Sequence, residues 1–93
     1  MSNQKFTSVW DALEDTSAEA ENMKLRSKLM MALKEYLSRN GLSQAEAAKL
    51  LGVTQPRVSD LMRGKINLFG LDALVNMATA AGLQVEMRVR KAA

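Results

Sequence analysis

The sequence predicts a mainly α-helical domain of four to five helices, followed by a C-terminal β-strand. Three observations predict this fold class. Apolar residues recur at helical spacing through most of the chain, glycines divide it into short blocks, and the last residues alternate apolar with polar. The glycines lie at positions 41, 52, 64, 70 and 82, and glycine often follows a helix end because it tolerates left-handed backbone. A length of 93 residues fits one small domain.

The N-terminal part contains two predicted helices. Apolar residues at i, i+3, i+4 and i+7 predict a short amphipathic helix over 6–13. The residues at 14–18 (EDTSA) predict a break. A longer helix is predicted over 18–39 and stops at Asn40-Gly41, a strong end signal. The apolar stripe of this longer helix consists of Leu25, Leu29, Leu33, Tyr36 and Leu37.

A capping box predicts the start of the next helix. Ser43 and Glu46 have the spacing at which each side chain binds the other residue's backbone N–H. The helix is expected to run through Leu51 and to stop at Gly52.

Two further helices follow. Thr54 can cap the first of them, with Pro56 in its first turn, where a missing N–H costs nothing. Gly64 is predicted to end this helix. The last helix is predicted over 71–81, with Gly82 just past its end.

The C-terminal segment changes its period. Leu83, Val85, Met87 and Val89 alternate with polar residues, which is typical of a strand. No other segment is a convincing partner, and an unpaired strand leaves its backbone donors and acceptors unmet. We therefore predict a homodimer in which these four residues pair the strands of two copies. The alternatives are a frayed tail or a strand that lies on its own helices.

Composition excludes several functional classes. The chain has no Cys and no His, so it lacks the usual ligands for structural zinc and the groups for disulfides, thiol chemistry or imidazole catalysis. Neither a Gly-rich phosphate loop nor a nucleophile–base constellation is present. An enzyme is thus the least supported class, and we expect no cofactor and no metal. The apolar runs are short, so we expect neither a signal peptide nor a membrane span, and a cytoplasmic location.

The charge is divided unevenly along the chain. Residues 1–22 contain one Lys and five acids, a net charge of −4, whereas residues 23–93 contain twelve bases and five acids, a net charge of +7. We therefore divide the chain into an acidic arm (1–22), a body (23–82) and a C-terminal strand with its tail (83–93). The pattern suggests two jobs or two partners, although ordinary solvated surface charge also explains it.

A helix-turn-helix motif is predicted between Gln44 and Arg63, which read QAEAAKLLGVTQPRVSDLMR. This geometry requires a small residue where the helices cross, a residue that tolerates the left-handed turn, and apolar anchors on the second helix. Ala48, Gly52 and Val58 have these properties at the required offsets. The spacing therefore predicts DNA binding.

The motif resembles that of the Xre/Cro/phage-repressor family, in which a helix-terminal Gln, the turn Gly and a Gln early in the recognition helix recur. The resemblance covers residues 25–82. With its VWDAL segment, its LFGLDALVNM block and its C-terminal strand, the whole chain resembles the HigA-type antitoxins of that family. The resemblance implies a repressor of its own operon that neutralises a HigB-like mRNA-cleaving toxin. The alternatives are a prophage-type regulator without a toxin and an interaction adaptor that no longer binds DNA.

The chemistry of the recognition helix predicts the DNA contacts. Gln binds adenine and Arg binds guanine in bidentate fashion, so Gln55 and Arg57 are the predicted base readers. The resemblance implies that Pro56 and Asp60 also face bases, with Pro in place of a polar residue. Thr54 is a cap rather than a base contact. The whole predicted set is Gln44, Thr54, Gln55, Pro56, Arg57, Ser59, Asp60, Arg63 and Lys65.

One recognition helix reads only a few base pairs. A two-fold dimer would present two such helices about 34 Å apart and would bind a palindromic double-stranded operator.

The acidic arm has an apolar stripe made of Phe6, Val9, Trp10 and Leu13. Such a stripe on an acidic segment suits docking to a small basic toxin, because an RNA-cleaving enzyme needs a basic surface. The alternative is that these residues complete a small core or pack across the dimer.

Overall fold

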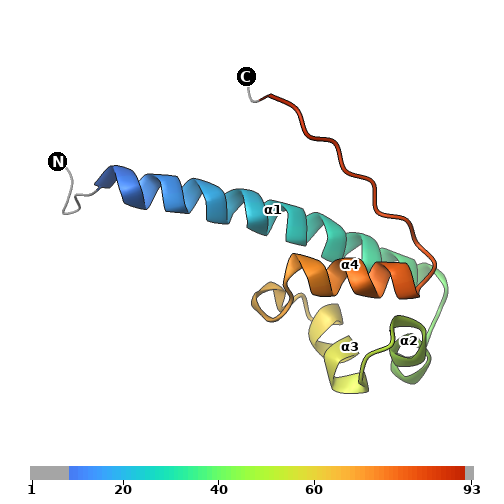
Figure 1. The fold of residues 1–93 in the computed structure, drawn as a ribbon. Coiled ribbons are helices and arrows are strands. Elements are labelled where there is room, and N and C mark those ends of the chain that lie inside the picture. The colour runs from blue at the N-terminus through green and yellow to red at the C-terminus, as the bar shows by residue number, and fades with distance from the viewer. Residues whose placement is uncertain (1–8, 92–93) are drawn as a thin grey trace.

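The computed structural model describes the backbone of residues 9–91 and the side chains from Ser17 to Lys91. Its elements follow the order α1 (Val9–Arg39), α2 (Gln44–Leu51), α3 (Gln55–Met62), the 3-10 turn η1 (Ile66–Leu68) and α4 (Leu71–Ala80). Figure 1 shows α4 packed along α1, with α2 and α3 on one side of this pair and the C-terminal segment on the other. The predicted mainly helical class is confirmed. No helix in the described range is long and apolar enough to cross a membrane.

Helix α1 is continuous where the sequence predicted two helices. The predicted break over 14–18 is wrong, because the backbone is helical from Val9 to Arg39. The EDTSA segment contains neither Gly nor Pro, and its residues differ in helix propensity by only about 0.7 kcal/mol at most. Turn-favouring residues alone therefore do not end this helix. It crosses the charge boundary at residue 22 and connects the arm to the body without a hinge.

The end of α1 agrees with its predicted stop signal. The Asn40 side-chain Nδ2 donates a hydrogen bond to the Tyr36 carbonyl at 2.8 Å. Gly41 takes the left-handed conformation with φ 59°, and the chain then turns so that Leu42 N–H reaches the Leu37 carbonyl at 3.4 Å. This turn directs the chain from α1 into α2.

The core lies where all four helices meet. Helix α1 contributes Leu33 and Leu37 of its apolar stripe to the core. The other helices pack aliphatic and small side chains against these two residues. Phe69, between η1 and α4, is 1% exposed and is the largest fully buried side chain. The buried residues are Met30, Leu33, Leu37, Ala47, Ala48, Leu51, Val58, Leu61, Phe69, Leu74, Met77, Ala78 and Ala81.

The C-terminal segment is extended but unpaired. Leu83 N–H donates to the Ala78 carbonyl at 2.9 Å, which holds the start of the segment against α4. From Gln84 to Lys91 the described part of the chain offers no backbone hydrogen-bond partner, so no strand is formed there. A strand requires a second strand beside it, and the predicted pairing across a homodimer remains a prediction.

Candidate nucleic-acid interface

Local capping sets the start of α2. Ser43 Oγ accepts a hydrogen bond from Glu46 N–H at 3.1 Å, and Ser43 N–H donates to Glu46 Oε1 at 2.9 Å. The predicted capping box is therefore confirmed. It satisfies backbone groups that the first turn leaves free and places Gln44 at the exposed first position of α2.

The turn between α2 and α3 has the predicted geometry. Gly52 has φ 70°, in the left-handed region, where a residue with a Cβ would be strained. Val53 N–H then donates to the Ala48 carbonyl at 3.0 Å. Thr54 Oγ1 accepts from Arg57 N–H at 3.4 Å, so Thr54 is the cap of α3.

Small side chains allow α2 and α3 to pack closely. Ala47 and Ala48 are buried on the inner face of α2. Val58 and Leu61 lie on the inner face of α3, and each has an exposed fraction of 0%. This contact holds the outer face of α3 in a defined orientation relative to the N-terminus of α2.

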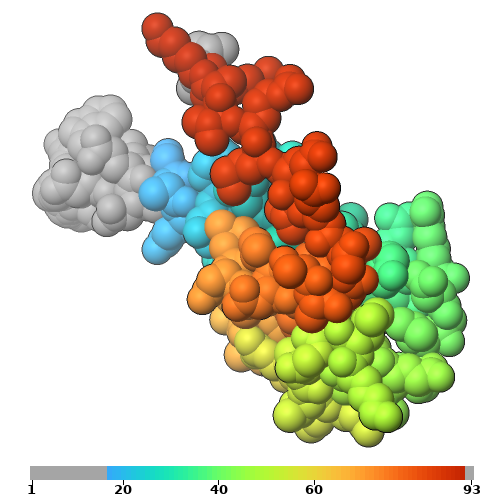
Figure 2. Space-filling view, turned by 45° about the vertical axis from the view of Figure 1, so that its right-hand side comes forward, coloured from blue at the N-terminus to red at the C-terminus, as the bar shows by residue number. Residues whose placement is uncertain are grey.

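The outer face of α3 is open to solvent. Figures 1 and 2 both place α2 and α3 at the end of the molecule opposite the C-terminal segment. Three of the predicted contacts, Arg57, Ser59 and Asp60, are half-buried. The exposed members of the predicted set are Gln44, Thr54, Gln55, Pro56, Arg63 and Lys65. The structure thus leaves the polar and basic members of this set open to solvent, on or next to α2 and α3.

The side chain of Arg57 makes contacts that the sequence did not predict. Its Nη1 donates to the Leu68 carbonyl at 2.7 Å, and its guanidinium carbon lies 4.0 Å from the centre of the Phe69 ring. The guanidinium therefore both hydrogen-bonds and stacks on the loop that follows α3. Base reading by Arg57 remains a prediction, and it would require the side chain to leave the Leu68 carbonyl.

Asp60 has a basic partner. Its Oδ1 lies 3.6 Å from Lys65 Nζ, with 29% of the Asp60 side chain and 48% of the Lys65 side chain exposed. A partly exposed pair of this kind contributes about 0–1 kcal/mol to stability. Its main effect is electrostatic, because Lys65 offsets a carboxylate that would otherwise repel phosphate.

A second arginine contacts the loop after α3, and sequence reasoning missed it. Arg26 of α1 donates from Nη1 to the Ile66 carbonyl at 3.3 Å. Arg26 and Arg57 thus hold two carbonyls of η1 from two different helices. The residues of these pairs are 40 and 11 positions apart, so no local sequence signal could have revealed them.

The other predicted site residues lie away from this surface. Leu83 is half-buried beside α4, whereas Val85, Met87 and Val89 are exposed along the C-terminal segment. Of the predicted toxin-docking residues, Phe6 lies outside the described residues. Val9, Trp10 and Leu13 have a described helical backbone only, and their side chains lie outside the described part.

Comparisons with known proteins agree with this geometry. A family model described as a helix-turn-helix domain matches residues 12–90. A solved structure described as an XRE family transcriptional regulator is similar to the chain with a TM-score of 0.73 and 36% sequence identity, over 80% of this chain and 83% of that one. Among proteins with curated functions, none matches. The chain therefore belongs to the helix-turn-helix family of DNA-binding transcriptional regulators of the XRE type.

Proposed function

We propose that this regulator is a sequence-specific repressor that binds a palindromic operator as a homodimer. The observation that carries the proposal is the division of α3 into two faces. Its inner residues Val58 and Leu61 are fully buried, whereas Gln55 and Pro56 at its N-terminal end are exposed. A helix anchored on one face and polar on the other is suited to enter the major groove.

Gln55 is the principal base reader in this proposal. It lies at the exposed first position of α3, where its amide can form two hydrogen bonds with adenine. Pro56 offers apolar contact to a thymine methyl, and Ser59 offers a hydroxyl one turn after Gln55. These residues supply specificity.

The residues around α3 supply backbone contacts in this proposal. Gln44, the first residue of α2, binds a phosphate beside the helix N-terminus in this proposal. Arg63 and Lys65 follow α3, are exposed, and add positive charge. Such contacts position the protein on the duplex without reading its sequence.

Operator binding tests this proposal. We expect duplexes selected from a random pool by the protein to share a palindrome with half-sites about one helical turn apart. We also expect affinity to fall steeply between roughly 50 and 200 mM salt. Equal affinity for selected and scrambled duplexes would exclude sequence-specific repression, and no DNA binding at low salt would favour the interaction adaptor.

We further propose that the regulator is a HigA-type antitoxin whose acidic arm docks on a small basic toxin. The resemblance of the whole chain to these antitoxins motivates the proposal, and the shape of α1 supports it. The N-terminal half of α1 extends past the other helices in Figure 1, and residues 17–22 are all exposed. This projecting half contains five acids and no base from Asp11 to Glu21, so it suits a basic surface.

Removing residues 1–22 is expected to abolish binding to the small basic RNase that this proposal requires as the product of a neighbouring gene. Among the described side chains of α1, from Ser17 onward, the buried ones begin at Met30, so the truncated chain retains the described core and is expected to keep its operator affinity. Calorimetry with the RNase and anisotropy with the operator measure the two effects. Unchanged RNase affinity would move the contact from the arm to the body, and no complex with the full-length chain would favour the prophage-type regulator.

A further inference from the structure

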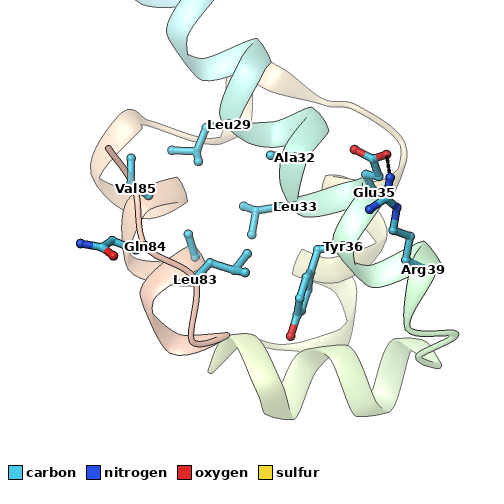
Figure 3. Close-up of a pocket in the computed structure, with 10 residues that line it drawn as sticks. Leu29, Ala32, Leu33, Glu35, Tyr36, Arg39, Leu83, Gln84 and Val85 are labelled. Atoms are coloured by element: carbon cyan, nitrogen blue, oxygen red, sulfur yellow. Dashed lines mark hydrogen bonds and ion pairs between the residues drawn. The ribbon is translucent and has the colours of Figure 1, made fainter. Parts of the chain in front are cut away.

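The C-terminal segment lies along α1 in the opposite direction and forms a shallow trough with it. Val85 lines a hollow of about 340 Å³ together with Leu29 and Tyr36 (Figure 3). Further along the segment, Met87 and Arg88 line a second hollow that also includes Leu25 of α1. The segment is therefore placed on the body at one end and is directed toward the arm at the other.

The apolar side of this segment becomes more exposed along the chain. The exposed fraction is 40% for Val85, 72% for Met87 and 87% for Val89. Leu25, on the facing side of α1, is 38% exposed. The segment therefore has apolar side chains at every second position and unpaired backbone groups beside them. These are the features of an open strand edge with one apolar face.

We propose that a second copy of the chain covers this edge through an antiparallel two-stranded ribbon centred on Met87. The register rests on the proposed homodimer and is independent of operator binding. With Met87 opposite Met87, Val85 lies opposite Val89 of the partner copy, so the apolar faces of both strands coincide. Glu86 then lies opposite Arg88, which forms two pairs of opposite charge across the two-fold axis.

The neighbouring registers are less favourable. Shifting the centre by half a residue places apolar side chains opposite polar ones, because side chains alternate with a period of two. A ribbon centred on Glu86 opposes two carboxylates and forms no pair of opposite charge. One centred on Arg88 opposes two guanidinium groups at the axis, although Glu86 then meets Arg90. Only the register centred on Met87 has opposite charges across the strands and no like charges.

The complementarity of charge between Glu86 and Arg88 favours a second copy of the chain as the partner that covers this strand edge. The segment carries its own charge complement in Glu86 and Arg88, both exposed and, among the described residues, both without an ion-pair partner. A different protein would need to supply both the apolar strand face and the same order of charges. A two-fold copy supplies them automatically.

Single-cysteine cross-linking tests the register, because the 93-residue chain contains no native Cys. Residues directly opposite in an antiparallel pair have Cα atoms about 4.5–5.5 Å apart, within the range for a disulfide. Under mild oxidation we therefore expect M87C to form a covalent dimer roughly tenfold faster than E86C or R88C. Faster cross-linking of E86C or R88C would overturn the register, and a monomeric wild-type chain in analytical ultracentrifugation would overturn the ribbon.

Charge reversal provides an independent measurement. R88E opposes Glu86 with a second carboxylate, and we expect it to raise the dimer dissociation constant roughly tenfold, or about 1.4 kcal/mol over two pairs. The double variant E86R/R88E is expected to restore the wild-type value, whereas R90E is expected to change it little because Arg90 faces Gln84. Failure of the double variant to recover would contradict the pairing.

The two proposals fail in distinguishable ways. If M87C does not cross-link but the protein still selects a palindrome, the operator-binding proposal survives and the ribbon is wrong. If M87C forms the dimer but no duplex is preferred, the ribbon survives and sequence-specific repression is wrong.

Discussion

Replacing Gln55 by alanine is expected to remove most of the preference for operator over scrambled DNA. A bidentate contact contributes about 1–3 kcal/mol of discrimination, and a two-fold dimer loses it at both half-sites, so the specific binding free energy weakens by roughly 2–6 kcal/mol. Gln55 is exposed at the start of α3 and its side chain forms no hydrogen bond with the described residues, so the loss of that side chain leaves the fold intact. Fluorescence anisotropy with both duplexes at one salt concentration measures the effect.

Gln44→Ala is the matched control for this experiment. Gln44 has the same side chain and also lies at the exposed first position of its helix. As a phosphate contact, it should weaken binding to both duplexes by a similar factor and preserve their ratio. If Q55A lowers affinity for both duplexes equally, Gln55 binds the backbone and base reading lies elsewhere on α3.

Replacing Leu61 by alanine is expected to lower the free energy of unfolding by about 2–5 kcal/mol. Leu61 has an exposed fraction of 0% and anchors α3 in the common core. The loss includes the transfer of the removed carbons and the cavity left among close-packed neighbours. Since small domains have a total stability of only about 5–15 kcal/mol, a large part of the margin disappears. Urea titration followed by circular dichroism gives the change.

Leu68→Ala provides the comparison for Leu61. Leu68 lies in η1 and is 47% exposed, and its contact with Arg57 uses the backbone carbonyl, which alanine retains. We expect a shift below about 1 kcal/mol, since part of this side chain is already in water. Equal urea midpoints for L61A and L68A would mean that α3 is not anchored through Leu61.

The helix-turn-helix was predictable because its signals are local. Ser43 and Glu46 are three residues apart, and Thr54 binds the N–H of Arg57 within the same turn. Gly52 has the left-handed conformation that its place between two helices required. Each of these features depends on neighbouring residues alone, so the sequence contained enough information to place the start of α3 and its exposed Gln55.

The predicted break in α1 shows where local signals are insufficient. Residues 14–18 favour turns only weakly, and helix formation is cooperative, so a weak segment between two helical ones is retained. Without Gly or Pro in this segment, the helix continues from Val9 to Arg39. The pattern of turn-favouring residues could therefore not show that α1 is one continuous helix.

The C-terminal segment shows a different limit. Its period-two alternation describes a strand, and the chain is extended there, but no other described segment pairs with it. Hydrogen bonds between strands involve two segments, and here the second one is proposed to belong to another copy. The sequence of one copy indicates the apolar face and the charge order, whereas pairing depends on association.

The sequence by itself determined the caps, the turn between α2 and α3, and the outward position of Gln55, because each depends on residues within one or two turns. Only the tertiary structure decided the position of Arg57, whose guanidinium meets the Leu68 carbonyl and the Phe69 ring. It also decided that Arg26 would reach the Ile66 carbonyl from α1. The physical reason is that such contacts depend on how distant segments pack around a shared core, and no short pattern along the chain specifies that packing.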